Sequence, residues 1–179
     1  MNLVILTGSP GTGKTTIAAR LAGENARGLH IPADVFYTFP AHPISPYRPA
    51  AYQQNADIIA AVTAASAAFA LRGYDVILEG IFGPRFLPVV ASELRPTGLH
   101  VQYVILQAPL ETALRRVQER IGHERDHVVR LVHAAFADLG PYEAHVVDTG
   151  ARSADAVAAE IGPLLDRGQF ALDLARVRE

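Results

Sequence analysis

Short runs of apolar and β-branched residues recur along the chain, and longer stretches with apolar residues at helical spacing separate them. The runs predict five strands, at residues 2–7, 29–31, 75–79, 100–106 and 144–148. The longer stretches predict helices over residues 14–25, 49–72, 85–94, 109–121, 126–138 and 153–166, with a last one near 168–178. Strands that alternate with helices form parallel sheets covered by helices on both faces. The pattern therefore predicts an α/β fold of this kind.

The first predicted strand leads directly into a glycine-rich loop, and a predicted helix follows at once. The loop matches the pattern G-x-x-x-x-G-K-[ST], which has meaning only between a strand and a helix. Its residues are Gly8, Ser9, Pro10, Gly11, Thr12, Gly13, Lys14, Thr15 and Thr16. In such a loop the backbone N–H groups and the helix N-terminus hold phosphate oxygens. Lys14 would reach the outer phosphates and the Thr15 hydroxyl would ligate Mg²⁺, so we expect a nucleotide site here.

An acidic residue and a proline-rich segment follow the second predicted strand. The Asp34 carboxylate is placed to accept the proton of an acceptor hydroxyl or to orient Mg²⁺, although it could also cap a short helix that starts near Val35. Residues 36–52 carry four prolines with aromatic residues between them, so they cannot form the interior of a helix or strand. We interpret this segment as one wall of an acceptor pocket, with Tyr37 as a candidate for substrate binding; a plain surface connection is the alternative.

The third predicted strand also ends at an acidic residue. Glu79 follows buried aliphatic residues and precedes Gly80, which is where P-loop proteins place a second acidic group that holds Mg²⁺ or its waters. A solvent-facing strand end is the alternative. Thr15 and Glu79 are therefore the predicted metal ligands. Arg85, a few residues later, is a candidate for binding a phosphorylated or acidic acceptor, or else for capping a helix.

Arginines are dense in the stretch from Arg115 to Arg130. Arg116 and Arg120 are four residues apart, so they share one face of a predicted helix. Phosphoryl transfer requires mobile cations over the β- and γ-phosphates, which both residues could supply. Gly122 follows as a candidate lid hinge. A solvated face with acidic partners is the alternative, and it suits Arg115 and Arg130 better than the other two.

The same stretch contains a rival motif that belongs to a different chemistry. Residues 123–127 read His-Glu-Arg-Asp-His, which is the H-E-x-x-H pattern of zinc proteases. Gly122 interrupts the helix just before this motif, the residues between the histidines are charged, and no obvious third ligand follows. We therefore do not expect zinc to bind there.

Composition narrows the classes of partner and compartment. The 179 residues suggest one domain over 1–179, and a formal net charge of -2 provides no basic field for nucleic acid. The absence of cysteine excludes disulfides, Cys-ligated zinc, iron–sulfur clusters and thiol nucleophiles, and it fits a reducing cytoplasm. No leader is recognisable, and the uncharged run at 58–71 is too short and too rich in alanine to span a membrane. We expect a cytoplasmic monomer or weak dimer.

The glycine-rich loop, Asp34, Leu78-Glu79-Gly80 and the pair Arg116 and Arg120 stand in the same order as in a known group. The chain resembles the small P-loop kinases: shikimate kinase, gluconate kinase and chloramphenicol phosphotransferase, with adenylate kinases and zeta toxins more distantly. The resemblance implies a five-stranded parallel sheet with a lid, and ATP and Mg²⁺ as cofactors. It implies that Asp34 activates the acceptor hydroxyl, that Arg116 stacks near the adenine beside residues 148–150, and that Arg120 touches the phosphates.

The expected activity is transfer of the γ-phosphate of ATP to a hydroxyl of a small molecule, with Lys14, Asp34 and Arg120 as catalytic residues. A nucleoside or nucleotide kinase is the first alternative. Residues 79–85 loosely resemble the acidic-Gly-Phe-Pro-Arg stretch of nucleoside monophosphate kinases, although they are two residues longer and have Glu in place of Asp. The second alternative, from another class, is an ATPase switch that acts on a protein partner.

Overall fold

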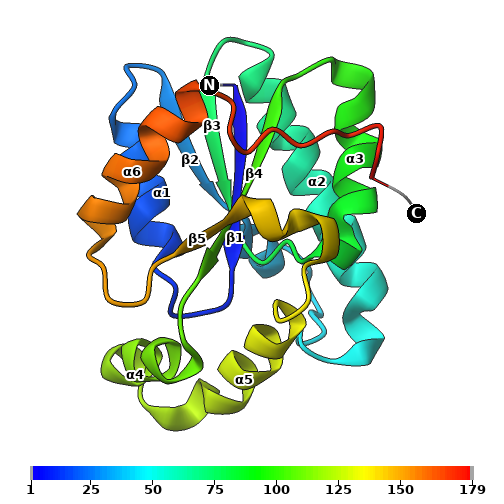
Figure 1. The fold of residues 1–179 in the computed structure, drawn as a ribbon. Coiled ribbons are helices and arrows are strands. Elements are labelled where there is room, and N and C mark those ends of the chain that lie inside the picture. The colour runs from blue at the N-terminus through cyan, green and yellow to red at the C-terminus, as the bar shows by residue number, and fades with distance from the viewer. Residues whose placement is uncertain (1, 178–179) are drawn as a thin grey trace.

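Five strands form a single sheet in the structure, a computed structural model that describes residues 2–177 (Figure 1). They are β1 (Leu3–Gly8), β2 (Gly28–Pro32), β3 (Asp75–Glu79), β4 (Val101–Gln107) and β5 (Val146–Asp148). All neighbouring strands of this sheet pair in parallel, and their order is β2-β3-β1-β4-β5. The predicted five-stranded parallel sheet is confirmed.

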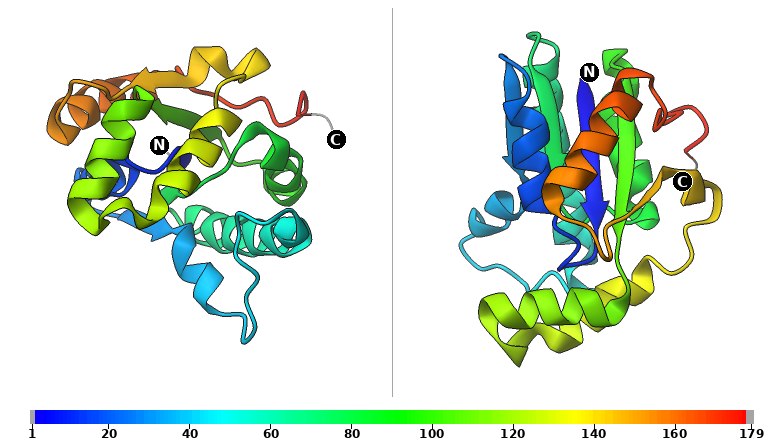
Figure 2. Two further views of the ribbon diagram at one scale, coloured as in Figure 1. Left: turned by 90° about the horizontal axis from the view of Figure 1, so that it is seen from below. Right: turned by 60° about the vertical axis from the view of Figure 1, so that its left-hand side comes forward.

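Helices cover both faces of the sheet, as the sequence pattern predicts. They are α1 (Lys14–Gly23), α2 (Tyr52–Ala70), α3 (Leu87–Leu94), α4 (Leu110–Ile121), α5 (Asp126–Ala135) and α6 (Ala154–Asp166). The helices α1 and α6 pack together on one face, and α2 and α3 pack together on the other (Figures 1 and 2). The pair α4 and α5 lies across the carboxyl ends of the strands, below the sheet in Figure 1. No helix within residues 2–177 is long and apolar enough to cross a membrane.

Two apolar cores explain why the central strands are almost continuously hydrophobic. Along β1, Leu3 and Ile5 pack into the core beneath α2 and α3, while Val4 and Leu6 pack into the core beneath α1 and α6. All four side chains are 0 % exposed. A strand covered on both faces buries successive side chains on opposite sides, so apolar residues occupy every position.

The helix predicted near 168–178 is wrong. Its described part, residues 168–177, has turns and an antiparallel bridge between Gln102 and Ala171. The Tyr103 N–H donates to the Phe170 carbonyl at 2.9 Å, and the Leu172 N–H donates to the Val101 carbonyl at 2.9 Å. The short strand β5 pairs with β4 only from Ile105 onward, which leaves the first half of β4 without a partner on that side. The C-terminal segment supplies the missing backbone hydrogen bonds.

Other predicted elements differ at their ends. The strand predicted at 144–148 begins only at Val146, because residues 140–145 form a 3₁₀ helix. The helix predicted at 49–72 starts as a 3₁₀ turn at Pro49–Ala51 before α2, and the one predicted at 85–94 starts as a 3₁₀ turn at Pro84–Phe86 before α3. Ends of helices are the places where local sequence signals are weakest.

The strand order brings the predicted chemistry to one edge of the sheet. The central strand β1 lies between β3 and β4, and the glycine-rich loop follows it. Glu79 is the last residue of the neighbouring β3, and Asp34 comes two residues after the end of β2. Ligands of open parallel sheets bind outside the carboxyl ends of the strands, where the order of strands reverses direction. That edge, beneath α4 and α5, is therefore the place to look for a site.

Candidate active site

The glycine-rich loop is already closed into a cradle. Gly8 and Gly11 have φ values of 143° and 86°, in the region that favours glycine. A Cβ at Gly8 would lie 2.2 Å from the carbonyl oxygen of Leu106, so another residue would also collide with β4. Thr12 Oγ1 donates to the Ser9 carbonyl at 2.9 Å and holds the turn together. The backbone is thus preorganised to present N–H groups to an anion.

Lys14 is buried at the first turn of α1. Its ammonium donates to the Ser9 carbonyl at 3.1 Å, so the side chain folds back over the loop. Burial lowers the pKa of Lys14, and the nearby cation Arg120 lowers it further, while the carboxylates of Glu79 and Asp34 raise it. A charge in this position is poorly solvated and faces two carboxylates.

Glu79 and Thr15 present oxygen atoms to the same place. The Thr15 hydroxyl donates to Glu79 Oε2 at 3.3 Å, although the two residues are 64 positions apart in the sequence. The Glu79 side chain is largely buried. Hydroxyl and carboxylate oxygens are the ligands that Mg²⁺ prefers, and phosphates and waters usually complete its octahedron. The donor set therefore fits a Mg²⁺ bound together with a nucleotide.

A cavity of about 250 Å³ joins these groups to Asp34. Its polar lining includes Lys14, Asp34, Tyr47, Glu79, Arg120 and Arg125. Asp34 is open to the cavity, and the surrounding walls together with the charge of Glu79 raise its pKa, whereas Lys14 and Arg125 lower it. A carboxylate with a raised proton affinity at the end of a cavity is suited to accept a proton from a bound hydroxyl.

The proline-rich segment lies against this cavity, but through a different tyrosine from the one predicted. Tyr47 lines the cavity, whereas Tyr37 does not. Burial raises the pKa of Tyr37 to about 12, with contributions from Asp34 and Tyr47, and Arg85 opposes the rise. The four residues therefore share one electrostatic neighbourhood. The guanidinium carbon of Arg85 lies 4.8 Å from the centre of the Phe86 ring.

Hydrogen bonds to α2 hold the outer part of the proline-rich segment. The Gln54 side chain exchanges two hydrogen bonds of 2.8 Å with the backbone of Ile44. Asn55 donates to the Pro46 carbonyl, also at 2.8 Å. These hydrogen bonds fix the backbone at Ile44 and Pro46, and so the position of the neighbouring Tyr47. Residues 39–48 are irregular, while 3₁₀ helices at Ala33–Thr38 and Pro49–Ala51 flank them and α2 begins at Tyr52. The role of this segment as an acceptor wall stays a prediction.

The two arginines predicted to share a helix face both line the cavity, but their environments differ. Arg116 donates to the carbonyls of Thr149 and Gly150, each at 2.9 Å, and to that of Gly11 at 3.3 Å. Arg120 forms no hydrogen bond or ion pair with the part of the chain that the structure describes. Arg116 therefore ties α4 to the loop after β5, and of these two arginines Arg120 is the one whose guanidinium has no partner among residues 2–177.

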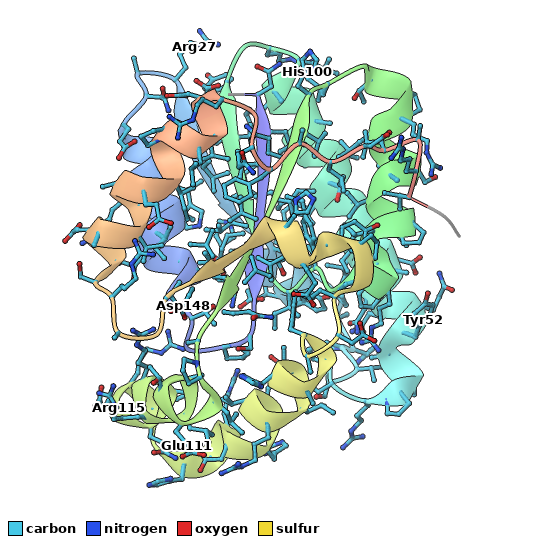
Figure 3. The ribbon with its side chains drawn as sticks, viewed as in Figure 1. Arg27, Tyr52, His100, Glu111, Arg115 and Asp148 are labelled. Carbon is cyan, nitrogen blue, oxygen red and sulfur yellow. The ribbon has the colours of Figure 1, made fainter. Side chains whose placement is uncertain are left out.

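A second hollow of about 210 Å³ lies beside Arg116. Its lining includes Thr12, Thr149 and Arg152, so it borders both the glycine-rich loop and the loop after β5. The Asp148 carboxylate accepts the Gly150 N–H at 3.0 Å and shapes that loop at the end of β5 (Figure 3). The resemblance places an adenine beside these residues, and the hollow provides space there.

The lid predicted around Gly122 has a core of its own. Ala113, Leu114 and Val117 of α4 pack against Val129 of α5, in an apolar cluster separate from the two cores of the sheet. Gly122, with a φ of 77°, ends α4 and separates it from α5. On the outer side of α4, Arg115 pairs with Glu119 at 3.4 Å, as expected for a solvated face (Figure 3). Val128 and Val132 of α5 belong to the core beneath α2 and α3, so α5 is also anchored to the sheet, and movement of the pair as a lid stays a prediction.

The rival H-E-x-x-H motif does not lie on one helix. Residues 123–125 form a 3₁₀ turn, and α5 begins only at Asp126. His123 Nδ1 lies 3.2 Å from Asp126 Oδ2, so its nearest partner is a carboxylate within the motif itself. Within residues 2–177 no three histidine, aspartate or glutamate side chains gather as metal ligands.

Sequence reasoning missed several residues that border the two cavities. Arg125 was part of the arginine-dense stretch, but nothing in the sequence set it apart from its neighbours. Arg152 borders the second hollow only because β5 pairs with β4. Its side chain follows β5 by four residues, so no spacing relates it to the glycine-rich loop.

The loop after β3 is held by two buried hydrogen bonds. The Phe82 N–H donates to Thr7 Oγ1 at 2.8 Å, and the Tyr103 hydroxyl donates to the Phe82 carbonyl at 2.6 Å. Burial, with a contribution from Tyr142, raises the pKa of Tyr103, so its hydroxyl remains a donor. These two bonds fix the backbone at Phe82, in the loop that leads from Glu79 to Arg85.

Tyr103→Phe is expected to lower the free energy of unfolding by about 1–3 kcal/mol, because the buried Phe82 carbonyl would lose its partner. Urea denaturation at equilibrium measures this change. Tyr142→Phe is the matched control: its ring packs edge-on against Tyr103 at 5.7 Å, and its hydroxyl forms no hydrogen bond with residues 2–177. Equal losses in the two variants would contradict the anchoring role.

A family model described as an AAA domain matches residues 3–139 of the chain. No curated protein matches this chain significantly in sequence. Among solved structures, a sugar kinase from Janibacter sp. HTCC2649 is 20% identical with a TM-score of 0.73, covering 93% of this chain and 95% of its own. A gluconokinase from Sinorhizobium meliloti 1021 is 17% identical with a TM-score of 0.69, covering 93% and 92%.

The APS kinase CysC of Mycobacterium tuberculosis, solved in complex with AMPPNP and APS, is 16% identical with a TM-score of 0.71 and coverages of 92% and 97%. These likenesses concern the fold, which in each case extends over almost the whole of both chains. Together with the strand order and the glycine-rich loop, they confirm the predicted architecture. The chain belongs to the AAA domain family described by the matching model, and it has the fold of the small P-loop kinases.

Proposed function

We propose that residues 1–179 act as one ATP- and Mg²⁺-dependent phosphotransferase that moves the γ-phosphate to a hydroxyl group of a small molecule. One observation carries the proposal. Lys14, Asp34, Glu79 and Arg120 come from four separate elements and line a single cavity between the carboxyl edge of the sheet and the lid helices. Phosphoryl transfer needs this combination of cations, a metal ligand and a base around one space.

Each group would have a distinct part in the reaction. The loop N–H groups and Lys14 would hold the phosphates, and Thr15 and Glu79 would hold Mg²⁺, which supplies neutralising charge to the phosphates when bound. Asp34 would accept the proton of the acceptor hydroxyl. Arg120, which has no partner among the described side chains, would stabilise the charge on the departing phosphoryl group. Closure of α4 and α5 would keep water from competing with the acceptor.

The acceptor would bind on the Asp34 side of the cavity. Tyr47 lines that side, and Tyr37 and Arg85 share the electrostatic neighbourhood of Asp34. The proposal concerns a small molecule because the cavity is only about 250 Å³ and the structural neighbours named above act on small molecules. A cytoplasmic location and a monomeric or weakly dimeric state stay predictions.

Screening hydroxylated metabolites, antibiotics and nucleosides for stimulated release of ADP tests the proposal. A true acceptor increases the release of ADP and gains labelled phosphate from [γ-³²P]ATP. Steady hydrolysis that no acceptor stimulates, together with a protein partner that binds only the ATP-loaded form, would favour an ATPase switch instead. Calorimetry that detects no binding of ATP, ADP or GTP at about millimolar concentration would overturn the proposal altogether.

Arg120→Ala is expected to lower turnover by about 10²-fold or more, while nucleotide affinity changes much less. The reason is that its charge matters most as the phosphoryl group departs, so the variant loses stabilisation of the transition state rather than of the ground state. Measurement of kcat, and of the Kd for ADP by calorimetry, shows whether turnover falls more than nucleotide affinity. Arg115→Ala removes a cation from the outer side of the same helix and is the matched control. Equal losses of affinity and turnover would argue against this role.

A further inference from the structure

A histidine lies on the face of the sheet that carries Glu79. Strand β2 alternates: Leu29 and Ile31 pack toward the core beneath α2 and α3, so His30 between them points to the face covered by α1. In the parallel register His30 pairs with Ile77, two residues before Glu79 on β3. Residues two apart on a strand share a face, so His30 and Glu79 are diagonal neighbours.

The ring of His30 leaves a polar atom without a partner. Its Nε2 atom is buried and forms no hydrogen bond with the described part of the chain, residues 2–177, and Glu79 Oε2 lies 3.6 Å away. An unpaired buried polar group destabilises the folded state, so such atoms in a native fold call for a reason. Nearby, α1 approaches β2 so closely that a Cβ at Gly28 would lie 1.7 Å from the Ala22 carbonyl oxygen. The start of β2 therefore lies tightly against the last turn of α1, on the face of the strand that also carries His30.

Two groups approach the same oxygen of Glu79 from different elements. Thr15 donates to Oε2 from the first turn of α1, and His30 Nε2 faces Oε2 from β2. If Nε2 carried its lone pair, that lone pair would point at a carboxylate oxygen and be repelled. With the proton on Nε2, the N–H dipole is attracted to the oxygen, so the surroundings select this tautomer.

We propose that His30, with a proton on Nε2, is a positioning residue that orients the Glu79 carboxylate for the metal. This inference depends on the proposed Mg²⁺ role of Glu79 and Thr15. Oxygen ligands of metals are usually held by hydrogen bonds from behind, and loss of such a partner lowers metal affinity by about 10–100-fold. Thr15 alone leaves the carboxylate free to turn about its own bonds, and a second donor from β2, whose Nε2 lies 3.6 Å from the same oxygen, would restrict that rotation.

The test measures binding rather than turnover. Mg²⁺ is titrated into each protein variant in the presence of ADP, and calorimetry reports how much Mg²⁺ half-saturates the ADP–Mg²⁺ complex. His30→Phe keeps a ring of similar size but removes the donor, and it is expected to raise that concentration about 10-fold or more. His30→Gln keeps an N–H donor and is expected to recover most of the affinity. ADP binding without Mg²⁺ is expected to stay as in the native protein.

The control is His133→Phe, which removes a partly buried histidine whose Nε2 lies 3.1 Å from the Ala108 carbonyl and has no other partner within residues 2–177. Circular dichroism and thermal unfolding verify that each variant folds, and if His30→Phe does not, the comparison of His30→Gln with His30→Ala replaces it. In a Glu79→Gln background the change at His30 is expected to have no further effect, because coupled residues are not additive. In the native protein, the imidazole ¹⁵N shifts of His30 are expected to place the proton on Nε2.

The outcomes separate the two proposals. If the native protein binds ADP equally well with and without Mg²⁺, the metal role of Glu79 fails, and the inference fails with it. If Mg²⁺ strengthens ADP binding in the native protein but His30→Phe requires no more Mg²⁺, the proposed metal site stands and the role of His30 is wrong. A proton on Nδ1 alone would also overturn it.

Discussion

Lys14→Ala is expected to abolish phosphoryl transfer and to weaken the binding of ATP and ADP. The ammonium of Lys14 is buried, donates to the Ser9 carbonyl, and lies among Asp34, Glu79 and Arg120. In the variant, the outer phosphates would meet two carboxylates with one cation fewer. Loss of a preorganised donor to developing charge lowers turnover on the order of 10²–10³-fold, and loss of a charge-assisted contact also lowers affinity. Turnover with a known acceptor, and calorimetry with ATP and with adenosine, measure the two effects.

Lys14 is the single lysine of the sequence, which permits an independent test. An amine-specific acylating reagent is expected to modify Lys14 and the N-terminal amine only, and ATP with Mg²⁺ is expected to protect Lys14.

The matched control for the Lys14→Ala substitution is Arg27→Ala, because Arg27 is a cation at the opposite end of the sheet that bonds the Arg72 and Gly73 carbonyls (Figure 3). Native affinity for ATP in Lys14→Ala, or modification of Lys14 that ATP does not slow, would contradict the prediction.

Asp34→Asn is expected to keep nucleotide affinity and to lose transfer, by about 10²–10⁴-fold, which is what one positioned base contributes. An asparagine preserves the shape of the side chain but cannot accept the proton. Burial and the charge of Glu79 raise the pKa of Asp34 above the usual 3.8. The base works only when it is unprotonated, so the native rate is expected to fall as the pH drops through that raised pKa. The residual rate of Asp34→Asn is expected to lack this acid limb.

Glu79→Gln is the comparison that separates the two carboxylates. Glu79 contacts Thr15 and lies within the sheet, so its loss is expected to raise the Mg²⁺ concentration needed for half-maximal rate rather than to remove the base. Transfer at the native rate in Asp34→Asn would make Glu79 the candidate base. Unchanged transfer in both variants would leave positioning by the arginines to account for catalysis.

The fold was predictable because its strongest signals are local. A β-branched run followed by closely spaced glycines and a helix describes β1, its loop and α1 without reference to the rest of the chain. Strands buried on both faces need apolar residues at successive positions, and this requirement is visible in the sequence. The alternation of strands and helices then restricts the sheet to parallel pairing.

The C-terminal segment shows where the local signal ends. Phe170 and Leu172 fall in the segment predicted as a helix, but in the structure they lie along β4 and are buried there. Phe170 packs into the core beneath α1 and α6, and Leu172 packs into the core beneath α2 and α3, so their burial depends on the sheet and not on the face of a helix. The C-terminal segment is extended here because the backbone groups in the first half of β4 have no other hydrogen-bond partner on that side. No local sequence pattern shows that these groups lack a partner.

By itself, the sequence determined the phosphate-binding loop, the five strands and the two acidic residues at strand ends, because each depends on residues close together along the chain. Only the tertiary structure decided which side chains meet. The order β2-β3-β1-β4-β5 puts His30 and Thr15 at the same oxygen of Glu79, and it turns Arg116 toward carbonyls 33 and 34 residues away. Such contacts depend on strand register and helix packing, which bring together residues that have no fixed spacing in the sequence.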